Sequence, residues 1–247
     1  MDKLLYLSMT GATQTMLAQT AHANNLANVN TTGFKSDLAQ ARAMPVFGDG
    51  YNSRVYAMTE RPATDQSPGM QNHTGNDLDV AIQGEGWLAV RAADGSEAYT
   101  RAGELQITAA GVLVTGSGLP VLGEGGPVQL PPAAKVDIGE DGTLTVKVVG
   151  DADNTLAVVD RLKLVKPAAG ELEKGLDGLM RASDNAVLQP DPTVRVKSGY
   201  LESSNVNAVS ELTAIIDLSR RFEMNIKMMQ DAKENSEAAA RVLQNLG

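Results

Sequence analysis

The feature that most constrains this sequence is a long stretch without charge. Residues 4 to 34 contain no Asp, Glu, Lys or Arg. Within this stretch the apolar positions follow a 4-3-4-3 spacing that only Gln19 interrupts: Leu5, Met9, Ala12, Met16, Ala23 and Leu26. This spacing predicts an amphipathic helix with a coiled-coil seam. Because a surface helix normally carries charged residues on its outer face, we expect neighbouring helices or subunits to surround this one.

The C-terminal part of the chain repeats the heptad pattern. Its strong apolar positions are Leu212, Ile215, Phe222, Ile226, Met229 and Leu243. The segment SSNVNAVSEL (residues 203–212) predicts the helix start, since Ser or Asn can cap free amide groups and Glu211 favours the positive end of the helix dipole. Isolated helices are marginal in water. We therefore expect residues 1–32 and 203–247 to form one terminal helical domain, with the seam residues at subunit interfaces.

The middle of the chain has a different periodicity. Residues 76–202 contain short Val, Ile and Leu segments, and turn signals such as AADGSE, TAAGVL, GEGGP and GEDGTL separate many of them. No helical pattern lies between these segments, so a βαβ unit is not expected. The pattern predicts a central, mainly all-β domain, a sandwich or barrel-like meander, within an α+β chain. Residues 33–75 are predicted to be an extended connector.

Charge and composition narrow the classes of function. The net charge is -9 and the pI is about 4.8, so the basic surface of a nucleic-acid-binding protein is missing. The chain has no cysteine, which excludes disulfides and thiolate metal sites. No stretch of 18 apolar residues suggests a membrane-spanning helix. The apolar run Leu4 to Leu7 is too short for a secretory signal, so we expect any export to follow another route.

Enzyme chemistry has little support in the sequence. The two histidines, His22 and His73, are far apart in the chain and have no partner at metal-ligand spacing. The GEDGTL segment resembles part of a calcium loop, but Val148 stands where the loop needs a bidentate Glu, so a hairpin turn is the better interpretation. We predict no catalytic residue, no metal site and no cofactor. A carboxylate pair among the 30 acidic residues remains an alternative that no spacing singles out.

Several segments resemble one protein family. The stretch ANNLANVNTTGFKS (residues 23–36) is similar to the end of the N-terminal helix in the axial proteins of the bacterial flagellum, the rod and hook family. NDLDVAIQGEGWLAV (76–90), AYTRAGELQIT (98–108) and GLPVLGEGGPV (118–128) resemble the family's central β region. SGYLESSNVNAVSELTAIIDLSRRFEMNIKMMQ (198–230) resembles its C-terminal segment. These segments cover much of the chain and occur in the family's order.

The resemblance implies a structural, non-enzymatic protein of the flagellar basal body. Subunits of the family stack into a hollow helical shaft, with terminal helices lining the inner tube and β domains facing outward. The implied partners are further copies of this chain, other rod proteins and the flagellar type III export apparatus, and the implied location is the periplasmic rod. The start of the chain, its single compact β domain and RRFEMNIKMMQ favour a proximal rod subunit.

The resemblance also suggests a role for the Asn-rich junction. Asn tolerates left-handed backbone conformations, and its amide both donates and accepts hydrogen bonds. We expect the asparagines to end the helix and to satisfy backbone groups without burying charge, with Gly33 permitting a sharp exit and Phe34 anchoring the connector. The junction residues predicted at subunit interfaces are Asn24, Asn25, Asn28, Asn30, Gly33 and Phe34.

Two other interpretations remain open at this point. The first is a distal rod or hook-type axial protein of the same family, although the length of 247 residues disfavours the hook proteins, which usually carry larger central insertions. The second, from another class, is a secreted oligomeric binding module whose β domain holds a ligand. Ordered termini in the free chain and a retained ligand would favour that module.

Overall fold

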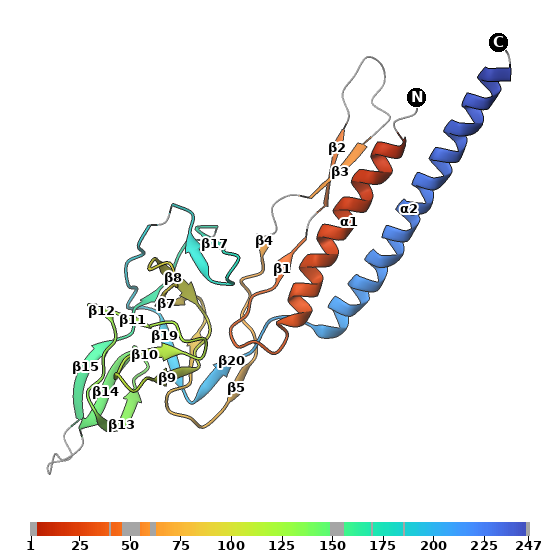
Figure 1. The fold of residues 1–247 in the computed structure, drawn as a ribbon. Helices are drawn as coiled ribbons and strands as arrows, with labels where there is room; N and C mark the ends of the chain where they lie inside the picture. The colour runs from red at the N-terminus through yellow and green to blue at the C-terminus, as the bar shows by residue number, and fades with distance from the viewer. Residues whose placement is uncertain are drawn as a thin grey trace. The chain divides into compact units, whose positions relative to one another are not determined.

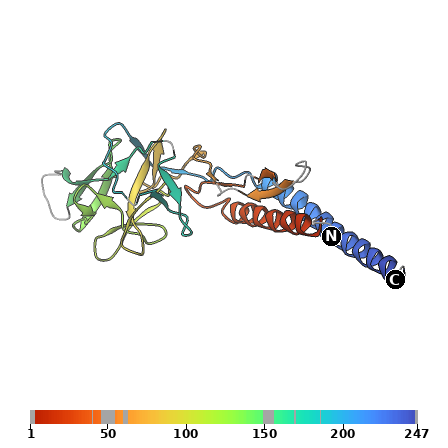
Figure 2. The ribbon, with the colours of Figure 1, turned by 90° about the horizontal axis from the view of Figure 1, so that it is seen from above.

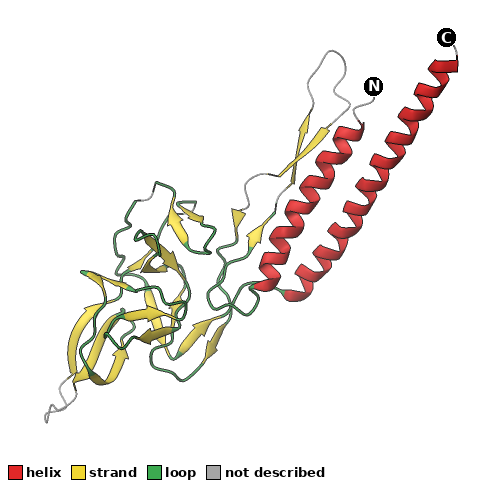
Figure 3. Cartoon of the chain, in the orientation of Figure 1, coloured by secondary structure: helices red, strands yellow, loops and turns green. Residues whose placement is uncertain are grey.

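The computed structural model describes residues 4–39, 41–45, 55–59, 63–148, 156–168, 170–184 and 186–245. The chain forms two compact units. The first, here called the helical unit, comprises residues 1–28, 36–65 and 206–247. The second, the β unit, comprises residues 29–35 and 66–205. Figure 3 shows that the helices belong to the first unit and most strands to the second.

Two long helices from the two ends of the chain build the helical unit. Helix α1 is Leu4–Ala27 and helix α2 is Ala208–Asn245. They lie side by side and antiparallel, and α2 continues beyond the start of α1 (Figures 1 and 2). Asn207 caps α2, because its side-chain Oδ1 accepts hydrogen bonds from the backbone N–H groups of Val209 and Ser210 at 3.0 and 3.2 Å. The predicted helix start is therefore confirmed, and Glu211 lies in the first turn.

Small side chains let the two helices approach each other. Ser8 and Ala12 are buried, and a Cβ placed on Gly11 would lie 3.2 Å from the side-chain Oδ1 of Asn225 on α2. Helices pack closely where the side chains between them are small. The threonines of α1 need no outside partner, since the hydroxyls of Thr10, Thr13, Thr15 and Thr20 each donate to the carbonyl four residues earlier. A charge-free helix is thus compatible with satisfied polar groups.

Short strands complete the helical unit. Strand β1 (Asp37–Leu38) pairs with β4 (Ala63–Thr64), and β2 (Ala41–Pro45) pairs with β3 (Val55–Thr59). Both pairs are antiparallel. Strand β3 packs against α1. The described part of the predicted connector, residues 33–75, therefore contributes these four strands and β5 of the other unit.

The β unit consists of small antiparallel sheets. The largest has the order β16-β7-β8-β18-β17, formed by Leu164–Val165, Trp87–Arg91, Glu97–Thr100, Met180–Ala182 and Leu172–Lys174. A three-stranded sheet joins β13 (Ala133–Ile138), β14 (Thr143–Val148) and β15 (Leu156–Arg161). The GEDGTL segment forms the turn between β13 and β14, as predicted.

Four further strand pairs belong to the β unit. Strand β5 (Gln71–His73) pairs with β20 (Tyr200–Glu202), and β6 (Val80–Gln83) pairs with β19 (Arg195–Ser198). Strand β9 (Leu105–Ile107) pairs with β10 (Leu113–Thr115), and β11 (Leu122–Gly123) pairs with β12 (Gly126–Pro127). Every strand pairing in the described part of the chain is antiparallel.

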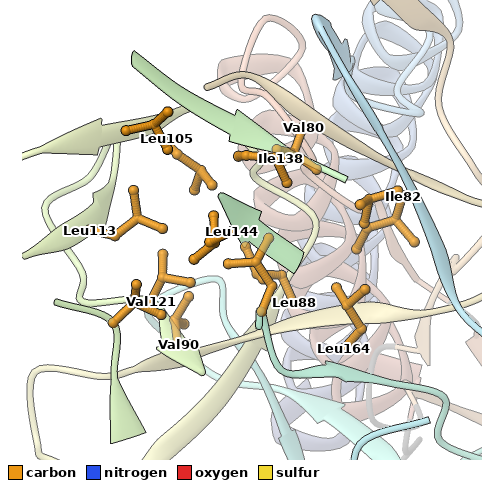
Figure 4. Packing of buried hydrophobic residues seen from close by; sticks show 14 of the residues in the cluster. Val80, Ile82, Leu88, Val90, Leu105, Leu113, Val121, Ile138, Leu144 and Leu164 are labelled. Atoms are coloured by element: carbon orange, nitrogen blue, oxygen red, sulfur yellow. The ribbon is translucent and has the colours of Figure 1, made fainter. Parts of the chain in front are cut away.

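Strand β7 contributes to two hydrophobic clusters. Leu88 and Val90 point into the main core, which Figure 4 shows with Leu144 and its neighbours. Trp87 and Ala89 belong to a second cluster with Tyr99. Because successive side chains of a strand point to opposite faces, both faces of β7 are covered. This burial supplies the main stabilisation of the β unit.

The predicted fold class is confirmed. The terminal helices are in contact, and a mainly β region of antiparallel sheets lies between them in the sequence. None of the described helices is long and apolar enough to cross a membrane.

Replacing Leu144 by Ala tests the core of the β unit. Leu144 is fully buried, so the truncation should lower the free energy of unfolding by about 2 to 5 kcal/mol. Urea unfolding followed by the fluorescence of Trp87 measures this loss, because Trp87 is the single tryptophan and is buried in the same unit. The control is Val158→Ala at an exposed position. Equal effects of the two substitutions would contradict the assigned core.

Candidate subunit interface and the junction motif

Much of the predicted apolar seam is exposed in the single chain. Leu5, Met9, Met16 and Leu212 are exposed, and Met16 is 61% accessible. Further apolar residues on the two helices are also exposed: Tyr6, Leu17, Val209, Ile216, Met224 and Met228. Contact between α1 and α2 therefore leaves apolar surface uncovered on both helices.

The other predicted interface residues differ in burial. Ala12, Asn25 and Gly33 are buried, whereas Ala23, Asn24 and Asn30 are exposed. The remaining ones are half-buried: Leu26, Asn28, Phe34, Ile215, Phe222, Ile226 and Met229. Leu243 lies on α2, but its side chain is outside the described residues. The prediction that this set meets other subunits stays a prediction.

Asn25 is the central residue of the Asn-rich junction. It is 1% exposed, and its amide pairs with the backbone of Asp37. Its Nδ2 donates to the Asp37 carbonyl at 2.9 Å, and its Oδ1 accepts from the Asp37 N–H at 2.8 Å. The side chain thus bonds both backbone groups of Asp37 as a neighbouring strand would, and it does so without introducing charge.

Asn24 and Asn28 act at the end of α1. The Asn28 Nδ2 donates to the Asn24 carbonyl at 2.9 Å and to its side-chain Oδ1 at 3.0 Å. The Asn24 Nδ2 in turn donates to the Asp37 carboxylate at 3.2 Å. The Asn28 side chain thus gives the Asn24 carbonyl a second donor, since the Asn28 N–H also donates to this carbonyl at 3.2 Å.

Gly33 occupies a position that no other residue fits. Its φ is +66°, and an added Cβ would lie 2.2 Å from the backbone carbonyl carbon of Arg101. Its N–H donates to the carbonyl of Glu202 at 2.8 Å. Left-handed backbone and close approach both require glycine here. In the next residue, Phe34, the centroid of the ring lies 3.9 Å from the Lys174 Nζ, which is a cation–π contact.

A buried ion cluster lies beside Gly33 in the β unit. The Lys35 Nζ lies 2.6 Å from Oε1 of Glu202, and the Arg101 Nη1 lies 2.9 Å from Oε2. The three side chains are 1 to 3% exposed. The Gly69 N–H also donates to Glu202 Oε1, at 2.9 Å. The excess positive charge is shared with carbonyls, since Lys35 donates to Ser67 and Arg101 donates to Gly84.

The cluster keeps Glu202 ionised. Burial alone raises the pKa of a carboxyl group, but the hydrogen bonds from Lys35 and Arg101 outweigh burial and hold the pKa of Glu202 below its ordinary value of 4.5. The folded state therefore favours the charged form.

Sequence reasoning missed this cluster and a second polar contact. His22 Nδ1 lies 2.5 Å from Oε2 of Glu211, which links the end of α1 to the start of α2. The sequence assigns Glu211 only to the helix dipole, and it offers His22 only as a weak candidate for catalysis or metal ligation. One available signal was Lys35, which is the first charged residue after the charge-free stretch. Arg101 and Glu202 carried no signal, because only the fold brings them to Lys35.

Family profiles match three parts of the chain. The profile "Flagella basal body rod protein" matches residues 5–35. The profile "Flagellar hook protein FlgE/F/G D1 domain" matches residues 81–146. The profile "Flagellar basal body rod FlgEFG protein C-terminal" matches residues 197–242.

Whole-length relatives agree with these profiles. The chain is 44% identical to the flagellar basal-body rod protein FlgF of Escherichia coli K12, with 98% of this chain and 99% of the relative covered. It is 43% identical to FlgF of Salmonella typhimurium over the same shares. The chain belongs to the FlgF family of flagellar basal-body rod proteins. FlgG of Agrobacterium fabrum is 33% identical over 86% of this chain and 88% of its own length.

Membership in the FlgF family agrees with the resemblance seen in the sequence and with a structural, non-enzymatic protein. The first profile covers α1 and the junction through Lys35, and the third covers β20 with most of α2. The ion cluster joins a residue from the first matched segment, Lys35, to one from the third, Glu202. No group of His, Asp or Glu suited to a metal ion occurs among the residues that the structure describes.

The substitution Glu202→Gln tests the ion cluster. It leaves two buried cations without a counter-charge, so the free energy of unfolding at pH 7 should fall by about 3 to 5 kcal/mol. Because the folded-state pKa of Glu202 is lowered, its contribution is present above pH 4.5 and is lost as the pH falls through the folded-state pKa. Urea unfolding at several pH values should therefore give a flatter acid profile for the variant, with exposed Glu140→Gln as control. Parallel profiles would contradict the assignment.

The substitution Asn25→Ala tests the junction. It leaves the N–H and carbonyl of the half-buried Asp37 without their partner and should cost about 1 kcal/mol. Hydrogen exchange should then be faster in the last turns of α1 and at Asp37, while Trp87 fluorescence stays unchanged. Asn30→Ala, at an exposed position of the same Asn-rich stretch, serves as control. Equal exchange in the two variants would show that the Asn25 amide has no special role.

Proposed function

We propose that this chain is a structural subunit of the proximal flagellar rod. In this role, copies of the chain and other rod proteins assemble into a hollow helical shaft that transmits torque and through which exported subunits pass. The observation that carries the proposal is the exposed apolar surface of a helix without charge, at Leu5, Met9 and Met16. Membership in the FlgF family supports it.

Contact with other subunits would remove the exposed apolar side chains of the helices from water. An exposed apolar side chain of this size gains about 1.5 to 3 kcal/mol when it is fully buried. Leu212 and Ile216 present similar surface on α2. Monomeric proteins rarely leave large contiguous apolar patches in contact with water. Burial against other subunits therefore stabilises the assembly more than the free chain.

The proposal includes a location and an export route. We infer that the chain lies in the periplasmic part of the basal body and that it reaches this site through the flagellar type III apparatus. The rod-protein relatives support this placement.

A distal rod position is the second candidate. The FlgG relative, which aligns over 86% of the chain, favours it. The higher identity to FlgF over nearly the whole chain favours the proximal position. Cross-linking of the assembled subunit to FlgG-type and to other rod subunits would separate the two positions.

The substitution Met16→Asp tests assembly. A charge at this exposed apolar position should leave the β unit folded but lower incorporation into isolated basal bodies roughly tenfold or more, because a buried charge is costly. Quantitative immunoblotting of purified basal bodies measures incorporation, and Trp87 fluorescence monitors folding. Met16→Leu keeps the surface apolar and should incorporate normally. Normal incorporation of Met16→Asp would argue against α1 as an assembly surface.

A further inference from the structure

Methionine is the only sulfur-containing residue type in this chain. The sequence has ten methionines and no cysteine. A thiolate is normally the most reactive sulfur toward a mild oxidant, whereas methionine reacts as a thioether and gives a sulfoxide. Because no thiol competes, the thioethers are the sulfur groups on which such an oxidant acts, and the exposure of each one decides how readily it reacts.

Four exposed methionines lie on the two helices. Met9 and Met16 belong to α1, and Met224 and Met228 belong to α2. Their exposed fractions lie between 45% and 61%. Met180 of the β unit, by contrast, is buried in the second hydrophobic cluster. A dissolved oxidant can therefore reach the four helix sulfurs of the free chain, but it cannot readily reach Met180.

The four methionines belong to two separate surfaces of the helical unit. Met224 and Met228 are one turn apart on the same face of α2, and they line a groove of about 640 Å³ that small residues of α1, such as Gly11, help to form. Met9 and Met16 are two turns apart on α1, and neither lines this groove. A change of methionine chemistry would therefore alter more than one apolar surface of the helix pair.

Oxidation makes these surfaces polar. The sulfoxide group carries an oxygen that accepts hydrogen bonds, so burying it requires a donor. Helix α1 has no Lys or Arg. The hydroxyls of Thr10, Thr13, Thr15 and Thr20 already donate to the carbonyls of the preceding turn. A sulfoxide buried on α1 would therefore find no cationic donor on its own helix, and burial without a donor is unfavourable.

We propose that Met9, Met16, Met224 and Met228 form a modification site, at which a hydroperoxide produces sulfoxides in the free chain and thereby prevents its incorporation into the rod. The thioether sulfur attacks one peroxide oxygen, the O–O bond breaks and an S–O bond forms. The proton of the transferred oxygen passes to the departing oxygen. Sulfur loses two electrons, and the peroxide is reduced to water or an alcohol. The inference rests on the proposed rod function, because it requires other subunits to cover these side chains.

Peroxide mapping tests the reactivity of the site. The purified full-length chain and isolated basal bodies are treated with dilute hydrogen peroxide, and mass spectrometry of peptides follows the gain of one oxygen at each methionine. In the free chain the four sites should react roughly tenfold faster than Met180, and in basal bodies they should react roughly tenfold more slowly than in the free chain. Rates in the free chain that match the rate of Met180 would overturn the inference.

A leucine variant tests whether these sulfurs matter for assembly. Leucine at all four positions keeps the surfaces apolar and removes the sulfur. In cells that assemble rods in sublethal hydrogen peroxide, incorporation of the unsubstituted chain should fall several-fold, whereas the fourfold leucine variant should keep its untreated level. Met70→Leu is the control, because Met70 is exposed on the β unit, and it should give no protection. An equal fall for the unsubstituted chain and the fourfold leucine variant would show that the four methionines are not the sensitive site.

Glutamine substitutions test the effect of polarity without an oxidant. Met9→Gln, Met16→Gln, Met224→Gln and Met228→Gln together place polar amides where the sulfoxides would form. Glutamine is a good helix former, so circular dichroism should stay unchanged while incorporation into basal bodies falls roughly tenfold or more. Normal incorporation of this variant would overturn the inference.

The outcomes separate this inference from the proposed function. If the unsubstituted chain is absent from untreated basal bodies, the rod assignment itself fails. If the chain is present and the fourfold glutamine and leucine variants incorporate equally well, the modification site is wrong and the rod assignment stands.

Discussion

The ion cluster of Lys35, Arg101 and Glu202 is the interaction that holds together the segments of the β unit from which the chain passes to the helical unit. Its three members come from the segment after α1, from the loop after β8 and from β20. Lys35 also donates to Ser67, and the Asn205 amide donates to the same carbonyl. Lys35, Ser67 and Asn205 each lie close to a border between the two units in the sequence. These bonds hold the three positions together within the β unit. A buried charge that loses its partner is strongly destabilising, so the cluster resists rearrangement.

Helix α1 depends on the opposite principle, the exclusion of charge. Small and polar residues lie between α1 and α2, and hydroxyls are satisfied by the preceding turn. Larger apolar side chains are left on the exposed surface. A helix without charged residues, such as α1, can be surrounded by other subunits without burying unpaired charges of its own. The same absence of charge that makes α1 unusual for a single chain makes it suitable for an assembly.

The β unit depends on a covered core. Strand β7 is buried on both of its faces, and β17 and β18 contribute Leu172, Met180 and Ala182 to the second cluster. Arg181 and Asp177 fix the turn between β17 and β18 locally, because Arg181 donates two hydrogen bonds to the Asp177 carboxylate. Apolar burial thus stabilises the sheets, and local hydrogen bonds order this turn at their edge.

The sequence alone determined the helix pair, the β region, the glycine exit and the Asn junction, because periodicity and local conformational preference act over a few residues. The start of α2 at Asn207 and the left-handed Gly33 are examples. Only the tertiary structure decided which polar groups meet. Lys35 and Glu202 are 167 positions apart, and the sheets alone bring them together. Burial of the ion cluster and the pairing of His22 with Glu211 likewise depend on long-range packing, which no local pattern encodes.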